Sequence, residues 1–155
     1  MHMLTKLRKD DRGQSFLEFV AVCVIIGILA TIIIAGFATV QRNRQNQQRQ
    51  TDINNIYQQL EAYYVVHSFY PTFADMNNTV WVGTNLPNLN LNSLRDPKSK
   101  SYLLKSVPTK DALAYQVTAA DGGLCNNVAL PCIHYTLTAT LVGTAQHTYV
   151  RSSLN

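Results

Sequence analysis

The feature that most constrains this chain is an apolar run near its N-terminus. Phe19–Val40 contains no charged residue in 22 positions and consists mainly of Ile, Val, Leu and Ala. A helix rises about 1.5 Å per residue, so this run would extend roughly 33 Å and could cross a bilayer core of about 30 Å. The sequence therefore predicts a membrane-spanning helix. About 115 residues remain for a soluble part, whose core must be modest.

Both flanks of this run are basic, so the positive-inside rule gives no orientation. The leading residues contribute +2 to a net charge of +4, and Arg42, Arg44 and Arg49 follow on the other side. We interpret these three arginines as a solvated flank that partly reaches back to the membrane surface. DNA and acidic lipid headgroups are the alternative partners, but a net charge of +4 gives nucleic acid no particular support.

The helical pattern continues beyond the apolar run. Gln41–His67 contains neither Gly nor Pro, so we predict a single helix over 16–67, roughly 75 Å long. The second half of this helix would pack onto a soluble part through one amphipathic face. The residues that form this apolar stripe at helical spacing are Ile53, Ile56, Tyr57, Leu60 and Tyr64.

The rest of the chain predicts a loop region followed by a small sheet. Residues 71–111 contain four prolines and read as a loop. Three segments, 112–119, 134–142 and 146–153, alternate apolar and polar residues as strands do. The last two are joined by a connection short enough for a hairpin, so they should be antiparallel. A sheet covered on one face by the helical stripe gives an α+β fold.

The three cysteines differ in their surroundings. Cys23 lies in the apolar run, where a thiol behaves as a small hydrophobe. Cys125 and Cys132 lie in a turn-rich stretch and should form a disulfide if this part is outside the cytoplasm. A zinc site with His134 and His147 is the alternative, although the C-x₂-C spacing of such sites is absent.

The N-terminus provides the most specific motif. The sequence "MHMLTKLRKDDRG" is short and basic and ends at Gly13, and Glu18 stands five residues later at the edge of the apolar run. A secretory signal peptide is one alternative, with cleavage after the apolar run. That run is, however, longer than the usual signal core and continues into a helical pattern.

These features resemble the type IV prepilins and the related filament subunits. In that family a short basic leader ends in Gly, and a Glu lies five residues into the mature chain, before a long apolar helix and a C-terminal antiparallel sheet. "FLEFVAVCVIIGILATI" is similar to the family's apolar segment, and 60–72 and 96–104 resemble the exit from the helix and the following loop. Gln14 departs from the large hydrophobe usual at the first mature position. The first half of the helix also lacks the family's common proline.

The resemblance implies a type IV pilin fold with four regions. Residues 1–13 would be the leader peptide, and 14–40 a helix that spans the membrane and later lies in a filament core. Residues 41–67 would continue the helix, and 68–155 would form a globular head with an αβ-loop and a three-stranded antiparallel sheet. The cleavage site would be Gly13–Gln14, and Gln14 would carry the modified, methylated N-terminus.

The resemblance also implies a function in assembly. Cleavage would create an α-amine at Gln14, with a reference pKa of about 7.7–8.0, that Glu18 of a neighbouring copy can neutralise. The partners would be copies of this chain and other pilins, a prepilin peptidase, an assembly ATPase, a platform protein and the membrane. The protein would be a single-pass protein of the cytoplasmic (inner) membrane and then part of an extracellular pilus (fimbrium), with roles in adhesion, motility or DNA uptake.

Three alternatives remain open. The first is a pseudopilin of a type II secretion or competence apparatus. The second is a minor pilin at a filament tip that binds DNA or a surface, and "RGQSFLEF" also resembles the start of the TadE-like minor pilins. The third is a membrane-anchored domain that never polymerises. We expect no enzyme, no cofactor, no metal and no catalytic residue, because the sequence contains no nucleophile elbow, phosphate loop or recognisable triad.

Overall fold

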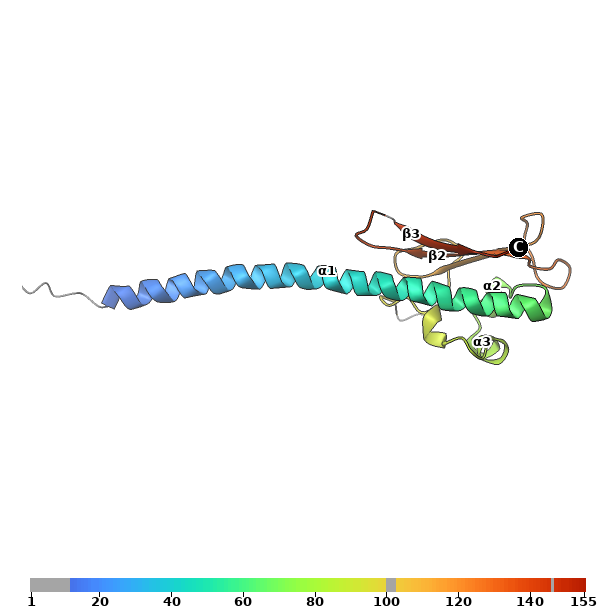
Figure 1. The fold of residues 1–155 in the computed structure, drawn as a ribbon, viewed down its shortest axis with the longest axis horizontal. Coiled ribbons are helices and arrows are strands. Elements are labelled where there is room, and N and C mark those ends of the chain that lie inside the picture. Colours follow the sequence, from blue (N-terminus) through green and yellow to red (C-terminus); the bar gives the residue numbers. More distant parts are fainter. Residues whose placement is uncertain (1–11, 100–102, 146) are drawn as a thin grey trace, which may run out of the picture. The chain divides into compact units, whose positions relative to one another are not determined.

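The computed structural model describes residues 12–99, 103–145 and 147–155. Its helices are α1 (Arg12–His67), α2 (Phe73–Met76), α3 (Thr79–Asn85) and the 3₁₀ helix η1 (Leu91–Leu94). Its strands are β1 (Ala114–Thr118), β2 (His134–Thr140) and β3 (Thr148–Ser152) (Figure 1). A long N-terminal helix and a small antiparallel sheet confirm the predicted α+β class.

The N-terminal helix begins earlier than predicted, at Arg12 rather than Phe16. The proposed leader lies outside the described residues up to Asp11, and Gly13 and Gln14 fall in the first turn of α1. The chain divides into two compact units, Met1–Gln41 and Arg42–Asn155.

In the unit Arg42–Asn155, α1 packs through the predicted stripe. Ile53, Ile56 and Leu60 are fully buried, and Tyr57 and Tyr64 lie half-buried against the same core. Burying an aliphatic side chain of this size contributes about 1.5–3 kcal/mol, so this stripe is a main support of the fold. The helix ends at His67 because Ser68 adopts a left-handed conformation with φ 61°.

Residues 71–111 are not simply a loop, and this prediction was wrong in part. Thr72 and Asp75 form a capping box that starts α2, and the Asn78 side chain accepts the amide hydrogens that start α3. Asn90 begins η1 in the same way. These caps satisfy backbone donors that short helices leave open, which is why one-turn and two-turn helices form between the prolines.

The sheet has the order β1-β2-β3, and both neighbouring pairs are antiparallel. All three predicted strands are therefore present, and Gly143 provides the positive φ of 75° in the connection between β2 and β3. In Figure 1 the sheet lies on one side of residues 42–67 of α1, and α3 and η1 lie on the other. The side chains that fill the core around α1 include Leu86, Leu94, Leu113, Tyr115 and Leu137.

Candidate functional site

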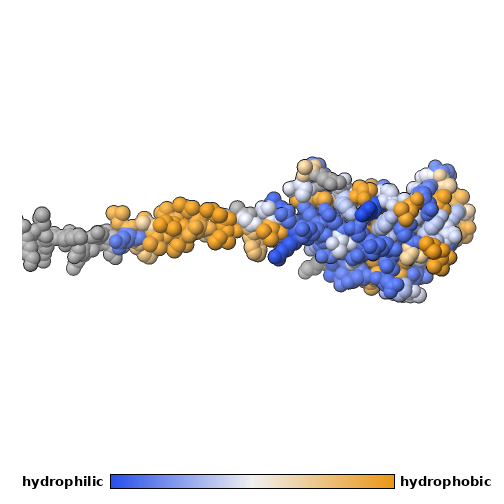
Figure 2. Space-filling model, viewed as in Figure 1, coloured by the Kyte–Doolittle hydropathy of each residue, from blue (hydrophilic) through white to orange (hydrophobic). Residues whose placement is uncertain are grey.

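The first part of α1 has an exposed apolar surface. Its large side chains have exposed fractions from 42% at Val20 to 73% at Leu17. No residue of its most apolar 18-residue window is buried, and the helix is long and apolar enough to cross a membrane. Figure 2 shows this surface as a nearly continuous apolar band. A helix that is apolar all round is stable only inside lipid or among other apolar helices.

Glu18 is the acidic group of this apolar segment. It is exposed at the start of the segment, four residues after Gln14. Within the described part of the chain the ion pairs join Arg49 to Asp96 and Lys98 to Asp111, and neither involves Glu18. In an apolar medium an ionised carboxylate is costly unless a cation pairs with it.

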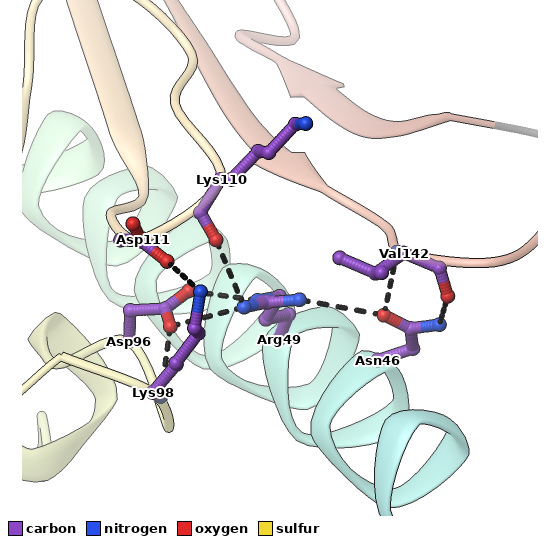
Figure 3. A network of polar contacts seen from close by, with 7 residues as sticks. All are labelled: Asn46, Arg49, Asp96, Lys98, Lys110, Asp111 and Val142. Atoms are coloured by element: carbon purple, nitrogen blue, oxygen red, sulfur yellow. Dashed lines mark hydrogen bonds and ion pairs between the residues drawn. The ribbon is translucent and has the colours of Figure 1, made fainter. Parts of the chain in front are cut away.

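A second group of polar side chains lies on the buried face of α1, where Arg49 is 1% exposed. Its Nε and Nη2 atoms donate to the two Asp96 carboxylate oxygens at 2.7 and 3.1 Å, and Nη2 also donates to the Lys110 carbonyl oxygen at 3.1 Å (Figure 3). One turn earlier, the Asn46 side chain exchanges two hydrogen bonds with the Val142 backbone, at 2.9 and 3.0 Å. These two residues of α1 thus fasten three separate loops to the helix.

This arrangement corrects the interpretation of Arg49 as part of a solvated flank. Arg42 and Arg44 are exposed, but Arg49 is not. The sequence does indicate the burial of Arg49, because this residue lies four positions before Ile53 and so continues the apolar stripe by one turn. A polar residue at a stripe position is an indication of a buried polar network.

Cys125 and Cys132 form the predicted disulfide. The sulfurs are joined to each other, so the zinc alternative with His134 and His147 is wrong. Inside the closed loop Asn127 is held in the left-handed region with φ 58°. Its side chain donates to the Tyr70 carbonyl oxygen at 2.7 Å and accepts from the Cys132 amide at 2.7 Å, which fixes the loop to the segment that leaves α1.

Replacing both cysteines, Cys125→Ser with Cys132→Ser, should lower the free energy of unfolding by about 2 kcal/mol, because a short loop loses its closure. Chemical denaturation in detergent, followed by the fluorescence of the single tryptophan, measures this loss. The variant Cys23→Ser is the matched control, since Cys23 is exposed and makes no disulfide. Equal stability of the double variant and the wild type would show that the disulfide is dispensable.

A carboxylate with two phenols lies near the end of α1. Glu61 accepts hydrogen bonds from the Tyr135 hydroxyl at 2.7 Å and from the Tyr70 hydroxyl at 3.1 Å. Burial, and then the nearby Glu61 charge, raise the pKa of both hydroxyls above the usual 10, so both phenols stay neutral and donate. The Tyr64 ring stacks on Tyr70 with centroids 4.5 Å apart. These contacts join α1 to the sheet, and both hydroxyl groups already donate to Glu61.

A cavity of about 500 Å³ lies beside β1 and β2. Its lining is mostly aromatic, aliphatic and hydroxyl-bearing, and includes Phe73, Ser106, Leu124 and His134 but no carboxylate. The His134 Nδ1 atom lies 2.9 Å from the Asn155 carbonyl oxygen, on the C-terminal segment.

The described residues thus contain an uncovered apolar helix with one acid, a polar network that fastens loops to α1, and a disulfide-closed loop. Nowhere in 12–99, 103–145 or 147–155 do three or more His, Cys, Asp or Glu side chains gather as metal ligands would. Comparisons with protein-family models, with curated proteins and with solved structures found no match to this chain.

Proposed function

We propose that this chain is a structural subunit of a type IV pilus or a related filament, with a type IV pilin fold. The observation that carries the proposal is the uncovered apolar surface of α1 from Phe16 to Val40, together with the one acid, Glu18, at its start. A helix that only anchored a domain would need the apolar residues but no carboxylate among them. An assembling helix needs both, because the carboxylate specifies which neighbour fits.

The charge argument gives Glu18 its role in the proposed filament. A charged side chain costs about 2.5–3.5 kcal/mol at the centre of a membrane helix on insertion scales, which is an upper bound for Glu18 at the edge of the apolar segment. Cleavage after Gly13 creates an ammonium group at Gln14, and pairing with Glu18 of a neighbour offsets that cost. In one chain Gln14 and Glu18 lie four positions apart at the start of the same helix. In the proposed filament, stacked copies bring the amine of one chain to the acid of another. A wrong stacking register leaves both charges unpaired, so the pair specifies register.

The unit Arg42–Asn155 supports the proposal in a different way. Its buried stripe ends in the polar residues Arg49 and Asn46, so the face that packs on the head begins several residues after Val40, the last residue of the exposed apolar run. A disulfide is typical of proteins outside the cytoplasm, which agrees with a head on the outer side of the membrane.

The proposal is tested on the natural product. Filaments sheared from cells that produce the protein are examined by electron microscopy, and the N-terminus of the purified chain is determined by mass spectrometry. The expected result is a filament whose bulk component begins at Gln14. A chain that keeps residues 1–13, stays in the membrane fraction and appears in no filament contradicts the proposal and supports a simple anchored domain.

A further inference from the structure

Asp52 lies on the buried face of α1, three residues after Arg49, and is 2% exposed. Its Oδ1 atom accepts a hydrogen bond from the Gln48 side chain at 2.9 Å. Its Oδ2 atom is buried and has no hydrogen-bond partner among the residues that the structure describes. An ionised carboxylate in such a place loses its hydration without replacement, and this cost is large unless a cation compensates it.

The buried guanidinium on this face of α1, that of Arg49, already pairs with another acid. The Nε and Nη2 atoms of Arg49 both donate to the Asp96 carboxylate, and both side chains are 1% exposed. The remaining Arg49 contacts go to the Lys110 carbonyl oxygen and, at 3.4 Å, to the Asn46 side chain. Two buried carboxyl groups therefore share the region of one buried cation, and Asp52 is the one that the cation does not contact.

The other charged groups of the region lie on the loops packed against α1. Lys98 and Asp111 pair with each other at 2.7 Å on the surface, where both are more than half exposed. Arg95, beside Asp96, is half-buried. The 3₁₀ helix η1 contributes no charge, only the Ser93 hydroxyl, which accepts from the Asn55 amide at 3.4 Å.

We propose that Asp52 is a buried proton-binding site that couples the packing of η1 on α1 to pH. In the packed state the carboxyl group holds its proton, which removes the unpaired charge. When the proton leaves, a second negative charge appears in the buried region of Asp96, and the contact between α1 and the segment 86–96 weakens. The site goes beyond the proposed assembly function and does not depend on it.

The pKa agrees with this geometry. Burial raises the pKa of Asp52 from 3.8 to about 6; the Gln48 hydrogen bond and the nearby Ser93 hydroxyl oppose this rise, and the Asp96 charge assists it. Because the folded state holds the proton more tightly, the stabilisation is complete below about pH 4 and is lost as the pH rises through about 6. This direction is opposite to that of an ordinary surface aspartate in an ion pair.

The test compares Asp52→Asn with the wild type in detergent-solubilised full-length protein. The amide resembles the protonated acid, so unfolding equilibrium constants should agree at pH 4. At pH 7.5 the unfolding equilibrium constant of the variant should be lower than that of the wild type by between about tenfold and a hundredfold. Asp111→Asn is the control, because the Lys98 partner lowers the pKa of exposed Asp111. Asp111→Asn should slightly destabilise the protein at pH 7.5, whereas Asp52→Asn should stabilise it.

Two further measurements keep the proposal open to refutation if the variant folds poorly. The ¹³Cγ resonance of Asp52 in the wild type should titrate near pH 6. Amide exchange in 86–96, corrected for the intrinsic pH dependence, should accelerate above pH 6 in the wild type. A midpoint near pH 4, or a variant less stable than the wild type at pH 7.5, would overturn the proposal by showing that Asp52 is ionised in the folded chain.

Discussion

Arg49→Met is expected to destabilise the unit Arg42–Asn155 by about 3–5 kcal/mol, which is a large part of the stability of an ordinary domain. The substitution preserves much of the side-chain volume but removes the cation, and it leaves Asp96 buried at 1% exposure without its partner. It also removes the donor to the Lys110 carbonyl oxygen. The loops at Asp96 and Lys110 should then detach from α1 first.

The measurement is denaturant unfolding followed by Trp81 fluorescence, since this ring lies 5.8 Å from Tyr63 of α1. Arg44→Met is the matched control: it removes the same charge from the same helix at an exposed position and should change stability by less than about 0.5 kcal/mol. Combining Arg49→Met with Asp96→Asn removes both charges and should recover much of the loss. If Arg49→Met unfolded like Arg44→Met, the buried ion pair would have no importance for stability.

Periodicity explains why most of the fold could be predicted from the sequence. Ile53, Ile56 and Leu60 recur at helical spacing, and Tyr115 and Leu137 fall on alternating strand positions, so their burial follows from two simple periods. The disulfide followed from two cysteines in one turn-rich stretch. Each of these features depends on residues that are close in the sequence.

The polar network could not be predicted in the same way, because its partners are far apart in the sequence. Arg49 and Asp96 are 47 residues apart, and Asn46 and Val142 are 96 apart. Composition makes an arginine beside other polar residues look solvated, and only the position of Arg49 on the stripe indicated otherwise. The burial of Asp52 could not be predicted in the same way, since Ser93 and Asp96, which lie near it, belong to a segment interpreted as a loop.

Glu18→Gln is expected to be inserted and cleaved normally but to reach filaments at a small fraction of the wild-type amount. The amide is similar in size and polar, so the helix still enters the membrane, and in fact more easily because no charge is transferred. In the proposed filament it lacks the charge that would neutralise the Gln14 ammonium group of a neighbouring copy. Stacked copies then bury an unpaired ammonium group, which costs several kcal/mol for each subunit added.

Two variants separate this assembly defect from other failures. Gly13→Leu should leave a larger, uncut precursor in the membrane, visible on a gel, whereas Glu18→Gln should have the size of the mature chain. Gly36→Ala is the control in the same apolar helix: it changes no charge, and within the described part of the chain no atom lies within 4 Å of the added methyl group, so it should still be processed and assembled. Immunoblots of sheared and cell-bound fractions measure the distribution of each variant. Wild-type amounts of filament from Glu18→Gln would refute the pairing of Glu18 with a neighbour's amine, even if the chain still proved to be a filament subunit.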